Sequence, residues 1–164
     1  MSNVLTPAQW NQLPKYHESV IPPEYIDGMG HMNVMWYTNL VSIGLWGFFQ
    51  KVGLTRDYFI QNRCGSFALE QNIRYMAEVR EGEKVSVRLR ALGRSAKKLH
   101  FMCFLIKDDS ETLSATAELV TAHIDMTVRR TAPFPEHIAN AFDGFLREHE
   151  QLDWQAPVNG VMKP

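Results

Sequence analysis

Residues 27–33 read DGMGHMN and run directly into an apolar segment, VMWYTNLVSIGLWGFFQ, at residues 34–50. Gly28 and Gly30 permit backbone angles that a side chain forbids, so the chain can turn sharply there and let a ligand approach closely. Asn33 is of a residue type that commonly caps a helix N-terminus. The stretch therefore predicts a tight turn followed by a long helix, with the carboxylate of Asp27 beside the helix start.

A carboxylate beside a helix N-terminus is suited to attack on a carbonyl group. Asp27 could act as a base, and the unsatisfied N–H groups of the first helical turn could polarise the carbonyl oxygen. Taken alone, an Asp in a turn more often only accepts turn hydrogen bonds. His31 has no adjacent Ser or Cys nucleophile, so we expect it to stabilise the turn or line a pocket.

The helix predicted over residues 34–51 carries apolar side chains on every side, which predicts that it has no solvent-exposed face. A membrane span is the alternative, because the segment approaches the length that crosses a bilayer. Polar residues interrupt the segment, and neither flank has a dense Lys/Arg cluster. We therefore expect that the segment does not cross a membrane and that a sheet wraps around the helix. Gly44 and Gly47 lack side chains and would let a strand or a partner helix approach this helix closely.

Periodic patterns after this helix predict the sheet. Apolar and polar residues alternate, or apolar residues run continuously, in four segments that read as strands: residues 67–75, 85–91, 99–106 and 115–124. Short turns at 93–95 and 108–110 predict an antiparallel meander. Residues 55–62 predict a short helix, and residues 135–149 an amphipathic closing helix.

With these segments in place, the chain resembles the hotdog-fold acyl-CoA thioesterases of the 4-hydroxybenzoyl-CoA thioesterase type. The resemblance rests first on the turn with Asp27, Gly30, His31 and Asn33, followed by Tyr37 on the helix. Residues 92–97 resemble the Gly-x-Ser turn of that family, and residues 123–135 its final strand and Pro-rich exit. The matching segments occur in the order expected for one domain.

The resemblance implies an α+β hotdog fold, in which an antiparallel sheet of about five to six strands wraps around one long central helix at about 34–51. A C-terminal helix closes the fold. We expect a single domain over residues 1–152 and a loose C-terminal tail over residues 153–164.

The resemblance also implies an acyl-CoA thioesterase that hydrolyses a thioester to a free acid and CoA. Asp27 is the catalytic carboxylate, either as general base or as nucleophile, and the main-chain N–H of Val34 binds the carbonyl oxygen. The substrate-binding residues are then Gly30, His31, Asn33, Val34 and Tyr37. The helix has no acid between Met32 and Lys51, which removes the helix-borne Glu used by other hotdog thioesterases; Glu70 is a reserve carboxylate.

The same resemblance implies a homodimer with active sites at the subunit interface, often paired again into a dimer of dimers. Four residues are candidates for contact with CoA: Arg94, Ser95, Lys97 and Lys98. Arg and Lys suit its phosphates, although a solvated turn explains such residues equally well. The apolar helix also suggests that Trp36 or Tyr37 touches an acyl group of undetermined chemistry.

Two other functions fit the same sequence. A hotdog hydratase or dehydratase would need an acid and a His to act together, which the spacing of Asp27 and His31 allows. A non-catalytic acyl-CoA sensor or binding protein would use the same fold without turnover, because fold does not fix function.

Composition limits the remaining possibilities. The chain has 164 residues and a formal net charge of -1, which fits one core and gives no general attraction for nucleic acid. Cys64 and Cys103 lack metal-ligand or disulfide-framework spacing, so we expect no metal site and no cofactor besides the CoA of the substrate. No signal-peptide pattern opens the chain, and a cytoplasmic location is expected.

Overall fold

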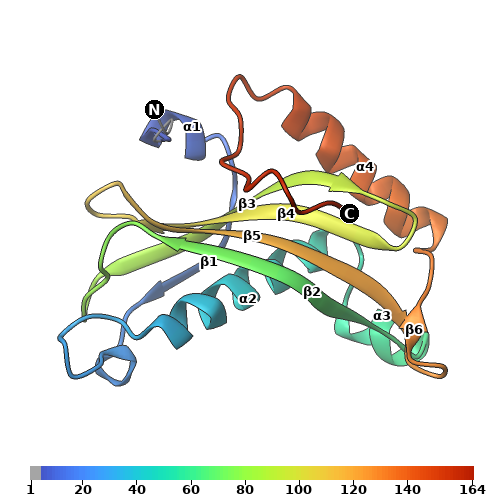
Figure 1. Cartoon of the computed structure of the whole chain (residues 1–164), viewed down its shortest axis with the longest axis horizontal. Coiled ribbons are helices and arrows are strands. Elements are labelled where there is room, and N and C mark those ends of the chain that lie inside the picture. The colour runs from blue at the N-terminus through green and yellow to red at the C-terminus, as the bar shows by residue number, and fades with distance from the viewer. Residues whose placement is uncertain (1–4) are drawn as a thin grey trace. The chain divides into compact units, whose positions relative to one another are not determined.

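The computed structural model describes residues 5–164, and Figure 1 labels the α-helices and strands. The helical elements are α1 (Pro7–Trp10), the 3-10 turn η1 (Pro23–Tyr25), α2 (Val34–Lys51), α3 (Arg56–Gln61) and α4 (Glu136–Glu150). The strands are β1 (Lys15–Val20), β2 (Cys64–Tyr75), β3 (Lys84–Arg94), β4 (Lys98–Lys107), β5 (Thr112–Asp125) and β6 (Arg130–Thr131). The α+β class, the long helix at 34–51 and the four predicted strands are confirmed.

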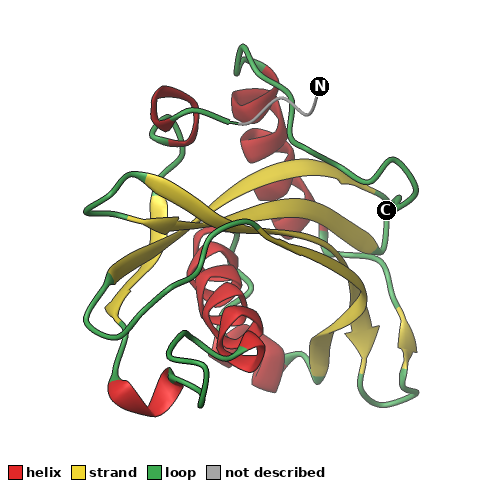
Figure 2. Ribbon diagram, turned by 60° about the vertical axis from the view of Figure 1, so that its left-hand side comes forward, coloured by secondary structure: helices red, strands yellow, loops and turns green. Residues whose placement is uncertain are grey.

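All six strands belong to one sheet, seen in Figure 2, with the order β1-β3-β4-β5-β2 and β6 paired with β5. Strands β3, β4 and β5 form the predicted meander. The prediction of a meander is wrong for β2, which lies beyond β5 at the sheet edge instead of next to β3. A short connection normally joins neighbouring strands. The short segment between β2 and β3 instead crosses to the other side of the meander, so its length did not reveal the position of β2.

Strand β1 has no counterpart among the sequence predictions. Its sequence is KYHESV, in which few residues are apolar, and it forms one edge of the sheet. It pairs with β3 in antiparallel register, with His17 opposite Val87 and Ser19 opposite Val85. An edge strand needs no continuous apolar pattern, so periodicity did not signal it.

Two compact units divide the chain, and α2 and the strands β2 to β5 each contribute to both. Among the described residues, unit 1 comprises 5–47, 73–89 and 103–117, and unit 2 comprises 48–72, 90–102 and 118–164. Each unit is described by itself below. The assignment of residues 1–152 to a single domain stays a prediction.

In unit 1, α2 packs closely against β1 and β3, as its glycines predict. A Cβ atom on Gly44 would collide with the side chain of Val87, and one on Gly47 would collide with the backbone carbonyl oxygen of Tyr16. Glycine at these two positions lets the helix backbone approach the strands closely. Leu40 and Val41 are buried beside this contact, at 1% and 2% exposure.

The prediction that α2 has no solvent-exposed face is wrong for the isolated chain. Four of its apolar side chains in unit 1 are substantially exposed: Val34 (58%), Met35 (60%), Ile43 (39%) and Trp46 (45%). The sheet covers the part of the helix that carries the glycines, and the sequence pattern does not distinguish that side from the exposed one. In the single chain these apolar side chains face solvent, and a second subunit would be needed to cover them.

In unit 2, aromatic side chains build the core around Phe48. Its ring lies 6.2 Å from that of Phe101 on β4, 5.9 Å from that of Phe142 and 5.1 Å from that of Phe145 on α4. Phe48, Phe101 and Phe142 are fully buried. The amphipathic pattern of α4 thus predicts its packing side correctly.

The C-terminal residues pack on unit 2, contrary to the expectation of a loose tail over residues 153–164. Trp154 is 4% and Met162 7% exposed. The guanidinium group of Arg90 donates hydrogen bonds to the carbonyl oxygens of Trp154 and His149, and it lies 4.5 Å from the Trp154 ring centroid. The N–H of Asn159 donates to the Glu118 carboxylate at 2.7 Å. The sequence does not reveal these contacts because their partners lie on β3 and β5.

Candidate active site

The turn at residues 27–33 is closed by its own backbone. The N–H of Asp27 donates to the carbonyl oxygen of His31, and the N–H of Gly30 donates to that of Asp27, both at 3.0 Å. Ile26 and Met32 form an isolated antiparallel bridge beside these bonds. Gly30 has a φ of 84°, a conformation that glycine adopts without strain. The predicted tight turn is confirmed.

The turn fixes the carboxylate of Asp27. Its Oδ1 accepts a hydrogen bond from the N–H of Met29 at 2.8 Å, and its Oδ2 lies 3.7 Å from Nδ1 of His31. The side chains of Asp27 and His31 are 26% and 34% exposed. One carboxylate oxygen is therefore held by the backbone, while the other lies beside the imidazole and is within reach of solvent or a ligand.

Helix α2 begins immediately after the turn, and Asn33 caps it. Its Oδ1 accepts a hydrogen bond from the N–H of Met35 and its carbonyl oxygen one from the N–H of Trp36, both at 3.0 Å. The backbone N–H of Val34 donates no hydrogen bond to any group within residues 5–164, and Val34 is 58% exposed. The helix N-terminus thus presents a free donor at its positive end.

A pocket of about 280 Å³ opens beside the turn and the helix start, within unit 1. The residues that line it are His31, Met32, Val34, Tyr37, Tyr75, Met76, Ala77 and Glu78. Three predicted substrate-binding residues, His31, Val34 and Tyr37, are therefore brought together. Asp27, Gly30 and Asn33 are not among the lining residues. Asp27 lies beside the lining residue His31, and Gly30 and Asn33 shape the turn and the cap.

Aromatic rings form part of the pocket wall. The rings of Tyr37 and Tyr75 lie 5.0 Å apart at an interplanar angle of 85°, and the Tyr37 hydroxyl lies 3.5 Å from the carbonyl oxygen of Ala77. Burial raises the pKa of Tyr37, and the charges of Tyr75 and Glu78 add to this effect. Trp36 stacks on Tyr25, with centroids 3.6 Å apart, and does not line the pocket.

Sequence reasoning missed the wall formed by residues 75–78. This segment ends β2, and it is tied down by Ser114, whose carbonyl oxygen accepts hydrogen bonds from the N–H groups of Met76 and Ala77. Directly after it, the carbonyl oxygen of Val79 accepts a hydrogen bond from the N–H of Met32 at 2.7 Å. The sequence showed the strand pattern of residues 67–75. It did not show the order of strands in the sheet, which brings the end of this strand close to the turn.

The candidate CoA-binding residues lie at the β3–β4 turn, in unit 2. Arg94 makes a two-point ion pair with Asp143 on α4, at 2.5 and 2.6 Å, which raises the pKa of Arg94. The Ser95 hydroxyl accepts hydrogen bonds from the N–H groups of Lys97 and Lys98. Lys97 is exposed and Lys98 half-buried. The structure thus commits Arg94 and Ser95 to local contacts and leaves the lysines more accessible.

Two further properties concern the whole described chain. No helix within residues 5–164 is long and apolar enough to cross a membrane. Nor does that part of the chain contain a group of three or more His, Cys, Asp or Glu side chains placed to hold a metal ion.

A family model described as the thioesterase-like superfamily matches residues 21–142, which include the turn, α2 and the pocket wall. The chain belongs to the thioesterase-like superfamily. The predicted hotdog thioesterase family and fold are thereby confirmed, and the region matched contains Asp27 and every residue that lines the pocket.

The sequence is also similar to proteins that are named as thioesterases. A betainyl-CoA thioesterase from Pseudomonas aeruginosa is 29% identical over 156 residues, covering 93% of this chain and 96% of its own. An L-carnitine dehydrogenase/betainyl-CoA thioesterase from Agrobacterium fabrum is 28% identical over 83% of this chain, which spans only 28% of that longer protein.

Solved structures show the same fold. A Staphylococcus aureus protein solved in complex with CoA has a TM-score of 0.82 and 23% identity, with 99% of each chain covered. A 1,4-dihydroxy-2-naphthoyl-CoA thioesterase from Synechocystis has a TM-score of 0.70 and 18% identity, over 77% of this chain and 93% of its own.

Proposed function

We propose that this superfamily member is an acyl-CoA thioesterase that uses Asp27 to hydrolyse a thioester to a free acid and CoA. The observation that carries the proposal is that residues 27–34 hold both an oriented carboxylate, fixed by the N–H of Met29, and the free N–H of Val34 at the start of α2. A thioester carbonyl needs a base or nucleophile on one side and a donor for its oxygen on another. Both groups are supplied by one continuous segment.

In the proposed reaction, the thioester carbonyl oxygen accepts a hydrogen bond from the N–H of Val34. As a general base, Asp27 takes a proton from water while the water oxygen attacks the carbonyl carbon. The tetrahedral intermediate then expels the CoA thiolate, which takes up a proton. As a nucleophile, the Asp27 carboxylate instead attacks the carbonyl carbon and expels the CoA thiolate, which takes a proton from water, to form an acyl anhydride. Water then hydrolyses the anhydride to the free acid and restores the Asp27 carboxylate. In both versions the helix N-terminus stabilises the negative charge that develops on oxygen.

His31 is a positioning residue in this proposal, because its imidazole lies 3.7 Å from the Asp27 carboxylate and it also lines the pocket. Lys97 and Lys98 remain the better candidates for CoA phosphates, since Arg94 is paired with Asp143. No cofactor beyond the CoA of the substrate enters the mechanism. A cytoplasmic location, where acyl-CoA occurs, fits this chemistry.

The names of the relatives suggest the first acyl group to test. The Pseudomonas aeruginosa protein, which is similar over nearly its whole length, is a betainyl-CoA thioesterase. We therefore include a betaine thioester in the substrate panel, beside aromatic, short-chain and long-chain acyl-CoAs.

We also propose that the protein works as a homodimer, with a dimer of dimers as a further possible assembly. Strand β2 is a sheet edge of 12 residues, and most of its side chains are exposed along both faces. A long exposed edge of this kind is a ready template for pairing with another chain. The exposed apolar side chains of α2 would also gain cover from a partner.

The test is thiol release from the acyl-CoA panel by wild type and by Asp27→Asn. Asparagine keeps an oxygen that accepts the Met29 hydrogen bond but is neither base nor nucleophile. We expect kcat to fall by about 10²–10⁴-fold with little change in KM. Saturable binding of acyl-CoA without turnover in either protein would contradict the proposal and favour a binding or sensor protein.

Asp125 provides a matched control. Its Oδ1 accepts a hydrogen bond from the N–H of Thr127 at 2.7 Å, the same two-residue turn contact that Asp27 makes with Met29. Asp125→Asn should leave turnover within about twofold of wild type, because it perturbs an equivalent turn outside the pocket.

A further inference from the structure

We propose that Glu78, together with the rings of Tyr37 and Tyr75, makes the active-site pocket selective for a short acyl group that carries a positive charge, such as a quaternary ammonium. This proposal rests on the function proposed above and adds the residues that select the acyl group.

The size of the pocket favours a small acyl group. Its volume is about 280 Å³. Ligand pockets commonly measure about 300–1,000 Å³, so this one lies just below that range. A long acyl chain would project out of it, whereas a compact branched group would fill it.

The charges around the pocket favour a cation. Glu78 is the only Asp, Glu, Lys or Arg among the residues that line this pocket. The Asp27 carboxylate lies 3.7 Å from His31 and adds negative potential at the same wall. An anionic acyl group would therefore meet like charges, and a cationic one opposite charges.

Arg80 only weakly neutralises Glu78. The two side chains approach to 3.5 Å, but they are 70% and 60% exposed. Such exposed ion pairs are screened by water and contribute little energy. A substrate cation that enters the pocket can therefore compete with Arg80 for the carboxylate.

The two tyrosines provide the complementary apolar surface. Their rings stand at 85° to one another, and Tyr75 is 51% exposed. An aromatic face attracts a cation through its quadrupole, and a quaternary ammonium gains most because its methyl groups also bury apolar area. The Tyr37 ring is held in place by burial at 4% exposure.

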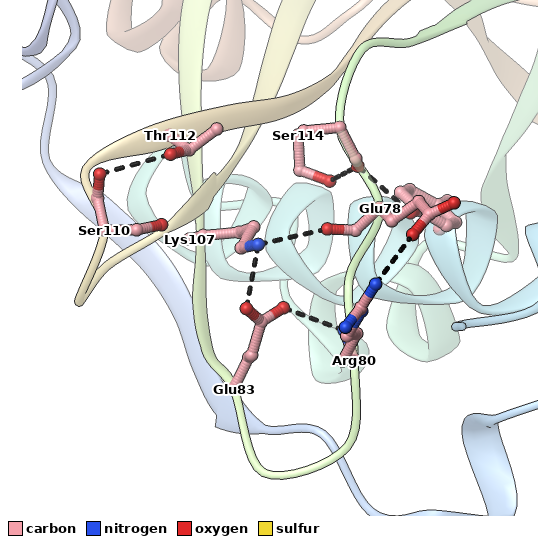
Figure 3. Close-up of polar contacts among 9 residues, drawn as sticks. Glu78, Arg80, Glu83, Lys107, Ser110, Thr112 and Ser114 are labelled. Atoms are coloured by element: carbon pink, nitrogen blue, oxygen red, sulfur yellow. Dashed lines mark hydrogen bonds and ion pairs between the residues drawn. The ribbon is translucent and has the colours of Figure 1, made fainter. Parts of the chain in front are cut away.

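Residues that do not line the pocket fix the backbone of Glu78 through the polar contacts drawn in Figure 3. Lys107 donates a hydrogen bond to its carbonyl oxygen at 3.1 Å and pairs with Glu83 at 2.8 Å. The hydroxyl of Ser114 donates to the carbonyl oxygen of the preceding Ala77 at 2.7 Å. The wall that carries the carboxylate is thus held beside the tyrosines before substrate arrives, which limits the entropy lost on binding.

The test compares two thioesters of nearly equal shape, trimethylammonioacetyl-CoA and 3,3-dimethylbutanoyl-CoA. They differ by a charged nitrogen in place of a carbon. We expect wild type to favour the cation by about tenfold in kcat/KM, and Glu78→Gln to lower this ratio by about fivefold. Tyr75→Leu should also lower the ratio, and Tyr75→Phe should keep it.

Glu81→Gln is the matched control, because Glu81 follows on the same segment but does not line this pocket. It should leave the ratio unchanged. A wild-type ratio near one, or a ratio that Glu78→Gln leaves within twofold of wild type, would overturn the selectivity proposal while leaving thioesterase activity standing.

Binding separates this proposal from the proposed function. Calorimetric titration of Asp27→Asn, with and without Glu78→Gln, measures affinity for the same two thioesters without turnover. Tighter binding of the cation that is lost with Glu78→Gln supports the pocket assignment even if wild type proves inactive. Equal affinities would overturn it.

Discussion

His149 is buried on α4 at 5% exposure, where its Nδ1 accepts a hydrogen bond from the N–H of Ala91 at 2.8 Å. Burial, with the positive charge of Arg90 as a second cause, lowers its pKa from 6.5 to about 4. His100 and Glu150 line the same cavity in unit 2. The folded protein therefore holds His149 neutral at pH values where the unfolded chain protonates it.

This difference predicts a pH dependence of stability. Because the folded pKa lies below the unfolded one, the contribution of His149 is complete above about pH 6.5 and is lost as the pH falls toward 4. The loss amounts to at most about 3 kcal/mol. Urea unfolding at pH 7 and pH 4.5 should show a larger drop in the free energy of unfolding for wild type than for His149→Gln. Equal drops in the two proteins would show that His149 does not carry the effect.

At the level of single residues, the sequence predicted the turn at residues 27–33 well because its determinants are local. Gly30 needs a positive φ, Asn33 caps the following helix, and Asp27 accepts a hydrogen bond from two residues further on. These contacts arise within one short segment. Glu78, in contrast, is brought to the pocket by contacts between segments that are distant in sequence, so no local pattern identified it.

Among the elements, α2 and its glycines give the clearest stability prediction. Gly47→Ala places a methyl group against the backbone carbonyl oxygen of Tyr16, which cannot rotate away as a side chain can. We expect a loss of about 1–3 kcal/mol in the free energy of unfolding, despite the higher helix propensity of alanine. Gly144→Ala on α4 is the control, because apart from its chain neighbours and the adjacent helix backbone no atom lies within 4 Å of the added Cβ. Chemical denaturation should show a loss only for Gly47→Ala.

The same elements show where periodicity succeeds and where it fails. Helix α2 and the meander of β3, β4 and β5 follow patterns that are repeated over many residues, and the sequence predicted them. Strand β1 and the packed tail at residues 153–164 are short or irregular, and their contacts lie with residues distant in sequence: Ser19 pairs with Val85, and Arg90 binds Trp154. Such elements acquire their structure from tertiary contacts rather than from a pattern of their own.

At the scale of the whole molecule, the position of β2 at the sheet edge has the widest consequence. The sequence predicted the strand but not the strands beside it. It therefore predicted neither that residues 75–78 form a wall of the pocket nor that β2 lies at an exposed edge of the sheet. Phe67 and Leu69 on this strand are 38% and 46% exposed. Apolar side chains on a long, unpaired edge invite association and are uncommon in strands that face only water.

The proposed dimer therefore predicts a mass of twice 18.9 kDa in light scattering at micromolar concentration. Leu69→Lys should shift the population toward 18.9 kDa, because a lysine on an edge strand opposes strand pairing and places charge in a closed interface. Ile60→Lys, at a position on α3 that is 64% exposed, is the control and should keep the wild-type mass. If the site is shared between subunits, the specific activity of Leu69→Lys should fall with dilution in parallel with the dimer fraction. A wild-type monomer that is fully active would refute both the dimer and the shared site, and would leave Asp27, Val34 and Glu78 as a site complete within one chain.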